Sequence, residues 1–107
     1  MTEVRAYDEC PTPSVASALA EFESDFHYPL GHHGWFRISH GRDYTRFFRA
    51  MGEARCFVAQ RDGMVTGVIS VARPMLRVPG GETIEAAYLA DLKIGTTAGG
   101  RTLLRLL

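Results

Sequence analysis

Beyond Arg55 the hydrophobic residues of the chain recur with a period of two, the period of a β-strand that buries one face. Two tight-turn signals interrupt this pattern, Asp62-Gly63 and Pro79-Gly80-Gly81. Asp-Gly is a strong signal for a two-residue hairpin, and short loops of this kind join antiparallel strands. The second half of the chain is therefore expected to form an antiparallel meander of three strands.

The three expected strands differ in composition. The first is CFVAQ, and the second, MVTGVISVA, continues past Pro74 to Val78 with a bulge or an edge at the proline, which has no amide hydrogen. The third is expected over Thr83 to Ile94, with one face formed by Ile84, Ala86, Tyr88, Ala90, Leu92 and Ile94. Strict alternation then places Glu85 and Asp91 together on the opposite face from Tyr88.

The first half of the chain has helical periodicity. A weakly alternating run over Thr2 to Tyr7 predicts a short first strand, and CPTPS breaks it. A helix is expected over about Pro13 to Phe26 and a second over Arg42 to Met51, ending at Gly52. The intervening segment HYPLGHHGWFRISH has no clean period and is expected to be a connecting loop.

The resulting order, β-α-α-β-β-β-α, predicts a single α+β domain over residues 1–107, an antiparallel β-meander with two N-terminal helices and a C-terminal helix. Twelve basic residues balance twelve acidic ones, which disfavours a nucleic-acid or anionic-membrane surface. No run of about 20 apolar residues predicts a membrane span. A charged N-terminus and two cysteines favour a cytoplasmic protein without disulfides.

The sequence ADLKIGTTAGGRTLLRLL at the end of the chain carries a strand into a Thr/Gly-rich turn and then into an apolar helical pattern. A helix N-terminus has free backbone N–H groups and a partial positive charge, so such a turn is suited to an anion. The spacing matches neither the P-loop pattern nor the dinucleotide-binding pattern G-x-G-x-x-G. A purely structural strand-to-helix connection is the alternative interpretation of the same residues.

In this context the chain resembles the GNAT superfamily of acyl-CoA-dependent N-acyltransferases. The resemblance rests on the hairpin FVAQRDGMVTGVISV, the strand AAYLADLKI and the turn TTAGGRTLLRLL, and covers about Arg55 to Leu107. It implies acetyl-CoA or another acyl-CoA as co-substrate and a small-molecule, peptide or protein amine as acceptor. The family pattern R/Q-x-x-G-x-G/A is met imperfectly, because Gly95 stands where Arg or Gln is usual and Ala98 where Gly is usual.

The resemblance assigns roles to individual residues. It implies that the strand residues Leu92, Lys93 and Ile94 contact the acyl group and pantetheine. It further implies that the turn binds the coenzyme A pyrophosphate through Gly95, Ala98, Gly99, Gly100, Arg101 and Thr102. It also implies that the connection between the first two helices shapes the acceptor pocket, with Tyr28, Trp35 and Phe36 as candidate acceptor-binding residues.

Candidate general bases lie on or near the third strand. Asp91 is the first candidate because it lies beside the expected acyl site, and Glu85 is the second. A solvent-facing or structurally hydrogen-bonded carboxylate is the alternative interpretation of Asp91. No metal site is expected, because His27, His32 and His33 lack the spacing of helical ligand pairs and no Cys or carboxylate falls at ligand spacing.

The apolar end of the chain, with Leu103, Leu104, Leu106 and Leu107, lacks a capping residue and a polar tail. The sequence therefore predicts the N-terminal portion of a longer GNAT-like domain, truncated and inactive in acyl transfer by itself. The alternative function is a non-catalytic module that senses a ligand or forms a homodimer through an exposed last strand or helix.

Overall fold

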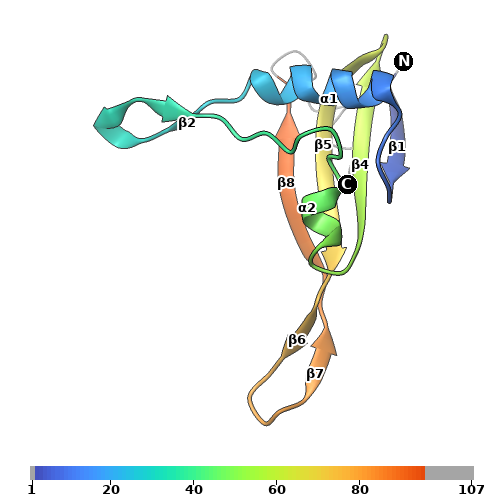
Figure 1. The fold of residues 1–107 in the computed structure, drawn as a ribbon, viewed down its shortest axis with the longest axis vertical. Coiled ribbons are helices and arrows are strands. Elements are labelled where there is room, and N and C mark those ends of the chain that lie inside the picture. Colours follow the sequence, from blue (N-terminus) through green and yellow to red (C-terminus); the bar gives the residue numbers. More distant parts are fainter. Residues whose placement is uncertain (1, 96–107) are drawn as a thin grey trace.

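The computed structural model describes residues 2–95 and has an α+β fold (Figure 1). Four strands form its main antiparallel sheet in the spatial order β1-β4-β5-β8. Their bounds are Glu3–Tyr7, Glu53–Arg61, Met64–Arg73 and Tyr88–Ile94. The predicted antiparallel meander is therefore confirmed, and the N-terminal strand extends it by pairing with β4.

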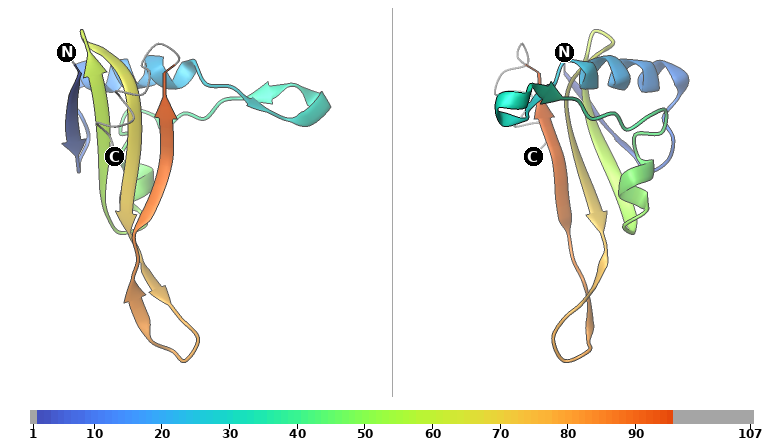
Figure 2. Two further views of the ribbon diagram at one scale, coloured as in Figure 1. Left: turned by 180° about the vertical axis from the view of Figure 1, so that it is seen from behind. Right: turned by 60° about the vertical axis from the view of Figure 1, so that its left-hand side comes forward.

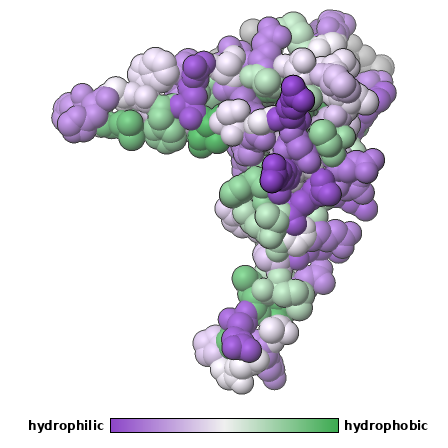
Figure 3. All heavy atoms as spheres, viewed as in Figure 1, coloured by the Kyte–Doolittle hydropathy of each residue, from purple (hydrophilic) through white to green (hydrophobic). Residues whose placement is uncertain are grey.

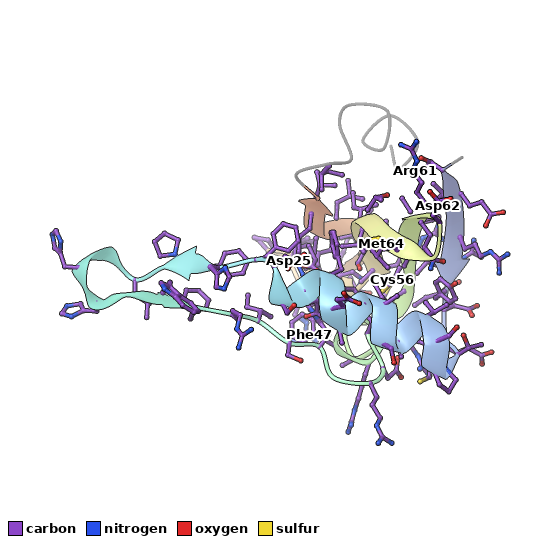
Figure 4. All side chains as sticks on the ribbon, turned by 90° about the horizontal axis from the view of Figure 1, so that it is seen from above. Asp25, Phe47, Cys56, Arg61, Asp62 and Met64 are labelled. Carbon is purple, nitrogen blue, oxygen red and sulfur yellow. The ribbon has the colours of Figure 1, made fainter. Side chains whose placement is uncertain are left out.

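The hairpin of β4 and β5 is the centre of this sheet. Its turn is Asp62-Gly63, as predicted, and both turn residues have positive φ angles of 53° and 76°. Asp and Gly tolerate this left-handed conformation, which matches the twist of the two strands. Asp62 and Met64 mark this end of the sheet in Figure 4.

Helices α1 (Pro13–Ser24) and α2 (Arg46–Arg49) lie on the same face of the sheet (Figure 2). Leu19 and Phe22 of α1 and Phe48 of α2 pack on inward-facing strand residues such as Val58 and Val68. Burial of apolar surface at this single interface supplies the main stabilisation of the fold. The predicted helix over about Pro13 to Phe26 is confirmed except for its last two residues.

The predicted helix over Arg42 to Met51 is wrong in length, since only Arg46–Arg49 is α-helical. The cause is Asp43, whose carboxylate accepts hydrogen bonds from the backbone N–H and the hydroxyl of Thr45. Such local side-chain bonds replace the first helical turn with a tight turn. The helix ends at Arg49, three residues before the Gly52 predicted as its stop. Gly52 instead turns the chain into β4, with a φ of 150° and no room for a side chain beside the carbonyl of Arg73.

The third strand of the meander is interrupted, contrary to the single strand predicted over Thr83 to Ile94. Strand β6 (Met75–Arg77) pairs with β7 (Thr83–Glu85), and β8 begins only at Tyr88. Pro74 separates β5 from β6 and donates no amide hydrogen, so the ladder breaks opposite it. The β6–β7 pair thus forms a hairpin that extends beyond the sheet (Figure 1).

A second hairpin projects sideways from the upper part of the body (Figures 1 and 2). Its strands are β2 (Tyr28–Pro29) and β3 (Trp35–Phe36), joined by the 3₁₀ turn η1 (Gly31–His33). Large apolar side chains are exposed on both hairpins, among them Trp35 and Met75. They form apolar patches on the two projections (Figure 3).

The two cysteines have opposite environments. Cys56 is buried beneath α1 (Figure 4) and accepts a hydrogen bond from Ser70, whereas Cys10 is exposed. Burial raises the pKa of the Cys56 thiol to about 11, so at neutral pH it stays protonated and unreactive.

We therefore expect one fast-reacting thiol in the native protein and two in denaturant, measured with a chromogenic disulfide reagent. A Cys10→Ser variant that still shows a fast-reacting thiol would contradict this assignment.

Candidate functional site

Strand β8 contains a β-bulge at Asp91. Ser70 pairs with Ala90 and Val68 pairs with Lys93, so Asp91 and Leu92 together face the single residue between them on β5. Asp91 has a positive φ of 59°, a conformation that Asp tolerates better than most residues.

The bulge changes which side chains share a face of the sheet. Asp91 now lies on the helix-covered face with Tyr88 and Ala90, because these three residues line one cleft. The alternation that placed Asp91 opposite Tyr88 is therefore wrong. One extra residue in a strand reverses the facing of every residue after it.

Five polar side chains meet beneath the helices, and we refer to them as the buried polar cluster: Glu23, His40, Tyr44, Asp91 and Lys93. They come from α1, the loop after β3, the turn before α2 and the bulged strand β8. Asp91 of β8 lies beside both His40 of the loop and Tyr44 of the turn. The side chains of Glu23, His40, Asp91 and Lys93 are only 4%, 9%, 15% and 5% exposed.

Asp91 is held by two strong partners. The Lys93 ammonium lies 3.0 Å from Asp91 Oδ1, and the Tyr44 hydroxyl donates a hydrogen bond to Asp91 Oδ2. Lys93 also lies 3.4 Å from the Tyr44 hydroxyl oxygen. Burial, followed by the hydrogen bond to Asp91, raises the pKa of Tyr44 far above its ordinary value. Tyr44 is therefore a hydrogen-bond donor at all physiological pH values.

His40 is held by Glu23. Its ring Nδ1 lies 3.0 Å from Glu23 Oε2, and its backbone N–H donates to the same oxygen at 3.0 Å. The ring stacks on Phe48 at a centroid distance of 5.4 Å. The other ring nitrogen, Nε2, lies 3.9 Å from Asp91 Oδ2, which is beyond hydrogen-bond distance. These contacts fix both the position and the plane of the imidazole.

An open cleft of about 570 Å³ lies against one side of the buried polar cluster. His40, Asp91, Ser39 and Arg46 are its polar lining residues. The rest of the lining is apolar: Ile38, Phe47, Phe48, Ala50, Tyr88 and Ala90. A mostly apolar cleft with a few convergent polar groups is typical of a small-molecule site.

The residues predicted to contact an acyl-CoA along β8 have separate surroundings. Lys93 is in the buried polar cluster, whereas Leu92 is exposed. Ile94 packs near Ile69 on the other face of the sheet. The Gly95 N–H donates to the Thr66 carbonyl at 2.8 Å, so this amide is already hydrogen-bonded. Ala98, Gly99, Gly100, Arg101 and Thr102 lie outside the described residues.

Other predicted site residues lie away from the cleft. Glu85 is on the β6–β7 hairpin, where it forms an exposed ion pair with Arg73. Tyr28, Trp35 and Phe36 are on the projecting β2–β3 hairpin, where Tyr28 packs on Phe36. The segment between the helices does contribute to the cleft, but through residues 38–40.

Glu23, His40 and Tyr44 were not identified from the sequence. Glu23 had a recognisable signal, because it follows Leu19 by four residues and so lies on the apolar side of α1. A carboxylate at such a position requires a buried partner. His40 lies at the end of an aperiodic loop, and no local pattern indicates that Glu23, seventeen residues earlier, binds it.

Within residues 2–95 no group of three or more His, Cys, Asp or Glu side chains could hold a metal ion. In the same part of the chain, no helix has both the length and the apolar character that crossing a bilayer requires.

Neither the family models, nor the curated proteins, nor the solved structures contain a match to this chain.

Proposed function

We propose that this chain is the acyl-CoA-binding portion of a GNAT-like N-acyltransferase, which moves an acyl group from acyl-CoA to an amine. The observation that carries the proposal is the bulge at Asp91 in β8, beside the cleft. A bulge leaves strand backbone groups outside the regular ladder, where they are free to bind a ligand. The strand order β1-β4-β5-β8 with both helices on one face also supports it.

Strand β8 is suited to an extended ligand because, among residues 2–95, it pairs with β5 along one edge only. Its other edge has backbone donors and acceptors available to the amide groups of pantetheine. We place the acyl thioester beside Asp91 and Leu92, and the pyrophosphate at the Gly-rich turn of residues 95–102. The Gly95 N–H already donates to the Thr66 carbonyl. In this proposal the phosphates therefore bind to the later turn residues, which include Arg101.

The chemistry requires a polarised thioester carbonyl and a correctly placed amine. In this proposal a backbone N–H of the bulge polarises the carbonyl. Asp91 does not act as the base, because Lys93 and Tyr44 already engage both of its oxygens. Its role is to hold the bulged backbone and the cleft wall in place.

Isothermal titration with acetyl-CoA tests the proposal. We expect saturable binding with a Kd below about 1 mM and weaker binding, by about tenfold, for Arg101→Glu, because the reversed charge repels the pyrophosphate. Arg42→Glu is the matched control, since Arg42 is exposed and lies outside the cleft. Absence of binding heat and of a thermal shift at millimolar acetyl-CoA would contradict the proposal.

The second candidate function is a homodimerisation module. The observation that favours it is the edge strand β8, on which Leu89 and Leu92 are exposed. An edge strand with exposed apolar residues can pair with a second copy. A dimer by light scattering, together with no response to acetyl-CoA, would favour this function over the transferase.

A further inference from the structure

We propose that His40, oriented by Glu23, takes the proton from the acceptor amine, and that the acceptor is a primary amine on an apolar body bound in the cleft. The catalytic part of this inference rests on the N-acyltransferase function proposed above. The binding part depends only on the cleft and on the contacts of the imidazole.

Glu23 determines which nitrogen of His40 is available. A carboxylate only accepts hydrogen bonds, so the 3.0 Å contact requires a proton on His40 Nδ1. The neutral imidazole then has its lone pair on Nε2. Glu23 is itself held by the backbone N–H of His40, so the side chain cannot turn away without breaking that bond. This arrangement of an imidazole oriented by a carboxylate is one that supports proton transfer.

The other titratable groups near the cleft are poor alternatives. Asp91 is paired with the Lys93 ammonium at 3.0 Å. Burial and Asp91 raise the pKa of Tyr44, which leaves it a donor and not a proton acceptor. Arg46 carries a permanent charge. Of the described cleft-lining side chains, His40 alone is an imidazole, the side chain that most often acts as a general acid or base.

The cleft lining determines the class of acceptor. Ile38, Phe47 and Tyr88 line the cleft and are exposed, and their apolar surface favours an aromatic or branched aliphatic body. Arg46 adds a positive charge to the same cleft. The reacting amine is neutral, whereas an ammonium group elsewhere on the acceptor would be repelled by Arg46, so we expect monoamines to be preferred over diamines.

The amine reacts as the neutral base, after its ammonium proton has passed to solvent. Its nitrogen forms a bond to the thioester carbonyl carbon, and one N–H proton passes to His40 Nε2. The tetrahedral intermediate collapses with cleavage of the C–S bond, and coenzyme A leaves as a thiolate. The imidazolium then returns its proton to the thiolate, which gives the free thiol and the amide and restores His40.

The role of His40 is tested by acetyl transfer from acetyl-CoA to 2-phenylethylamine, measured by mass spectrometry of the product. This proposal expects the full chain to catalyse that transfer, in contrast to the inactivity predicted from its sequence. We expect His40→Gln to lower kcat by about 100-fold and Glu23→Gln by about tenfold, with the KM for acetyl-CoA unchanged. Glu21→Gln and His33→Gln are matched controls on exposed sites and should retain wild-type rates. Wild-type kcat in His40→Gln would overturn the proposal.

A second measurement uses the wild-type chain and needs no turnover. In ¹⁵N spectra of the histidine rings, we expect His40 to carry its proton on Nδ1 and its Nε2 resonance to shift when 2-phenylethylamine is added. Putrescine should cause a smaller shift. A proton on Nε2, or an Nε2 resonance that the amine does not change, would overturn the proposal. If acetyl transfer is absent but these signals are present, the transferase function fails while the amine site of His40 stands.

Discussion

Replacement of Lys93 by Met is expected to lower the free energy of unfolding by about 3–5 kcal/mol, which is the usual cost of removing one partner from a buried ion pair. The Lys93 ammonium is 3.0 Å from Asp91 Oδ1, and its side chain is almost fully buried. Without it, the Asp91 and Glu23 carboxylates share a water-poor site, and His40 is the remaining partner of both among the described ion pairs. Urea unfolding followed by circular dichroism measures the loss.

Two further variants separate the effect of breaking the ion pair from the effect of replacing a long side chain on the free energy of unfolding. Arg55→Met removes an exposed strand cation and should change the free energy of unfolding by less than about 0.5 kcal/mol. Asp91→Asn tolerates the positive φ and keeps an acceptor for Tyr44, so combining it with Lys93→Met should restore part of the lost stability. A Lys93→Met protein as stable as the wild type would show that the pair is not buried as described.

The second large loss of stability is expected at one of two adjacent phenylalanines, Phe48 but not Phe47. Phe48 is 1% exposed and packs in the core that joins both helices to the sheet, whereas Phe47 is 58% exposed. We expect Phe48→Ala to lower the free energy of unfolding by about 3–5 kcal/mol through lost burial and a cavity. The same measurement on Phe47→Ala should show a loss below about 1 kcal/mol.

The Phe48 result also bears on the cleft, because Phe48 supports the ring of His40 and lines the cleft beside it. Equal losses in the two variants would contradict the observed orientation of α2. A loss larger in Phe47→Ala than in Phe48→Ala would show that the helix is rotated and that His40 has a different neighbour.

Local sequence patterns predicted some elements of this fold correctly. The Asp62-Gly63 turn, the proline break and the helical period of α1 act over a few residues, so each is readable without the rest of the chain. The bulge at Asp91 is different, because a two-residue period assumes that both strands of a ladder advance together. Tertiary pairing with β5 determines where that assumption fails.

The buried polar cluster was less predictable for the same reason. Its contacts join residues that are far apart in sequence, such as Tyr44 with Asp91 and Lys93. The place of Asp91 on the expected acyl strand makes it a candidate, and it does lie at the cleft. Glu85 is a candidate because it shares the expected strand and face with Asp91, but the break at Pro74 places it on a separate hairpin.

Amide chemical shifts recorded as acetyl-CoA is added to the full chain show whether the ligand binds along β8. We predict that the largest changes occur at the bulge and the end of β8, from Asp91 to Gly95, with smaller changes at His40 and almost none on β1, across the sheet. Changes confined to β1 or to the projecting hairpins, or no changes at saturating ligand, would contradict it.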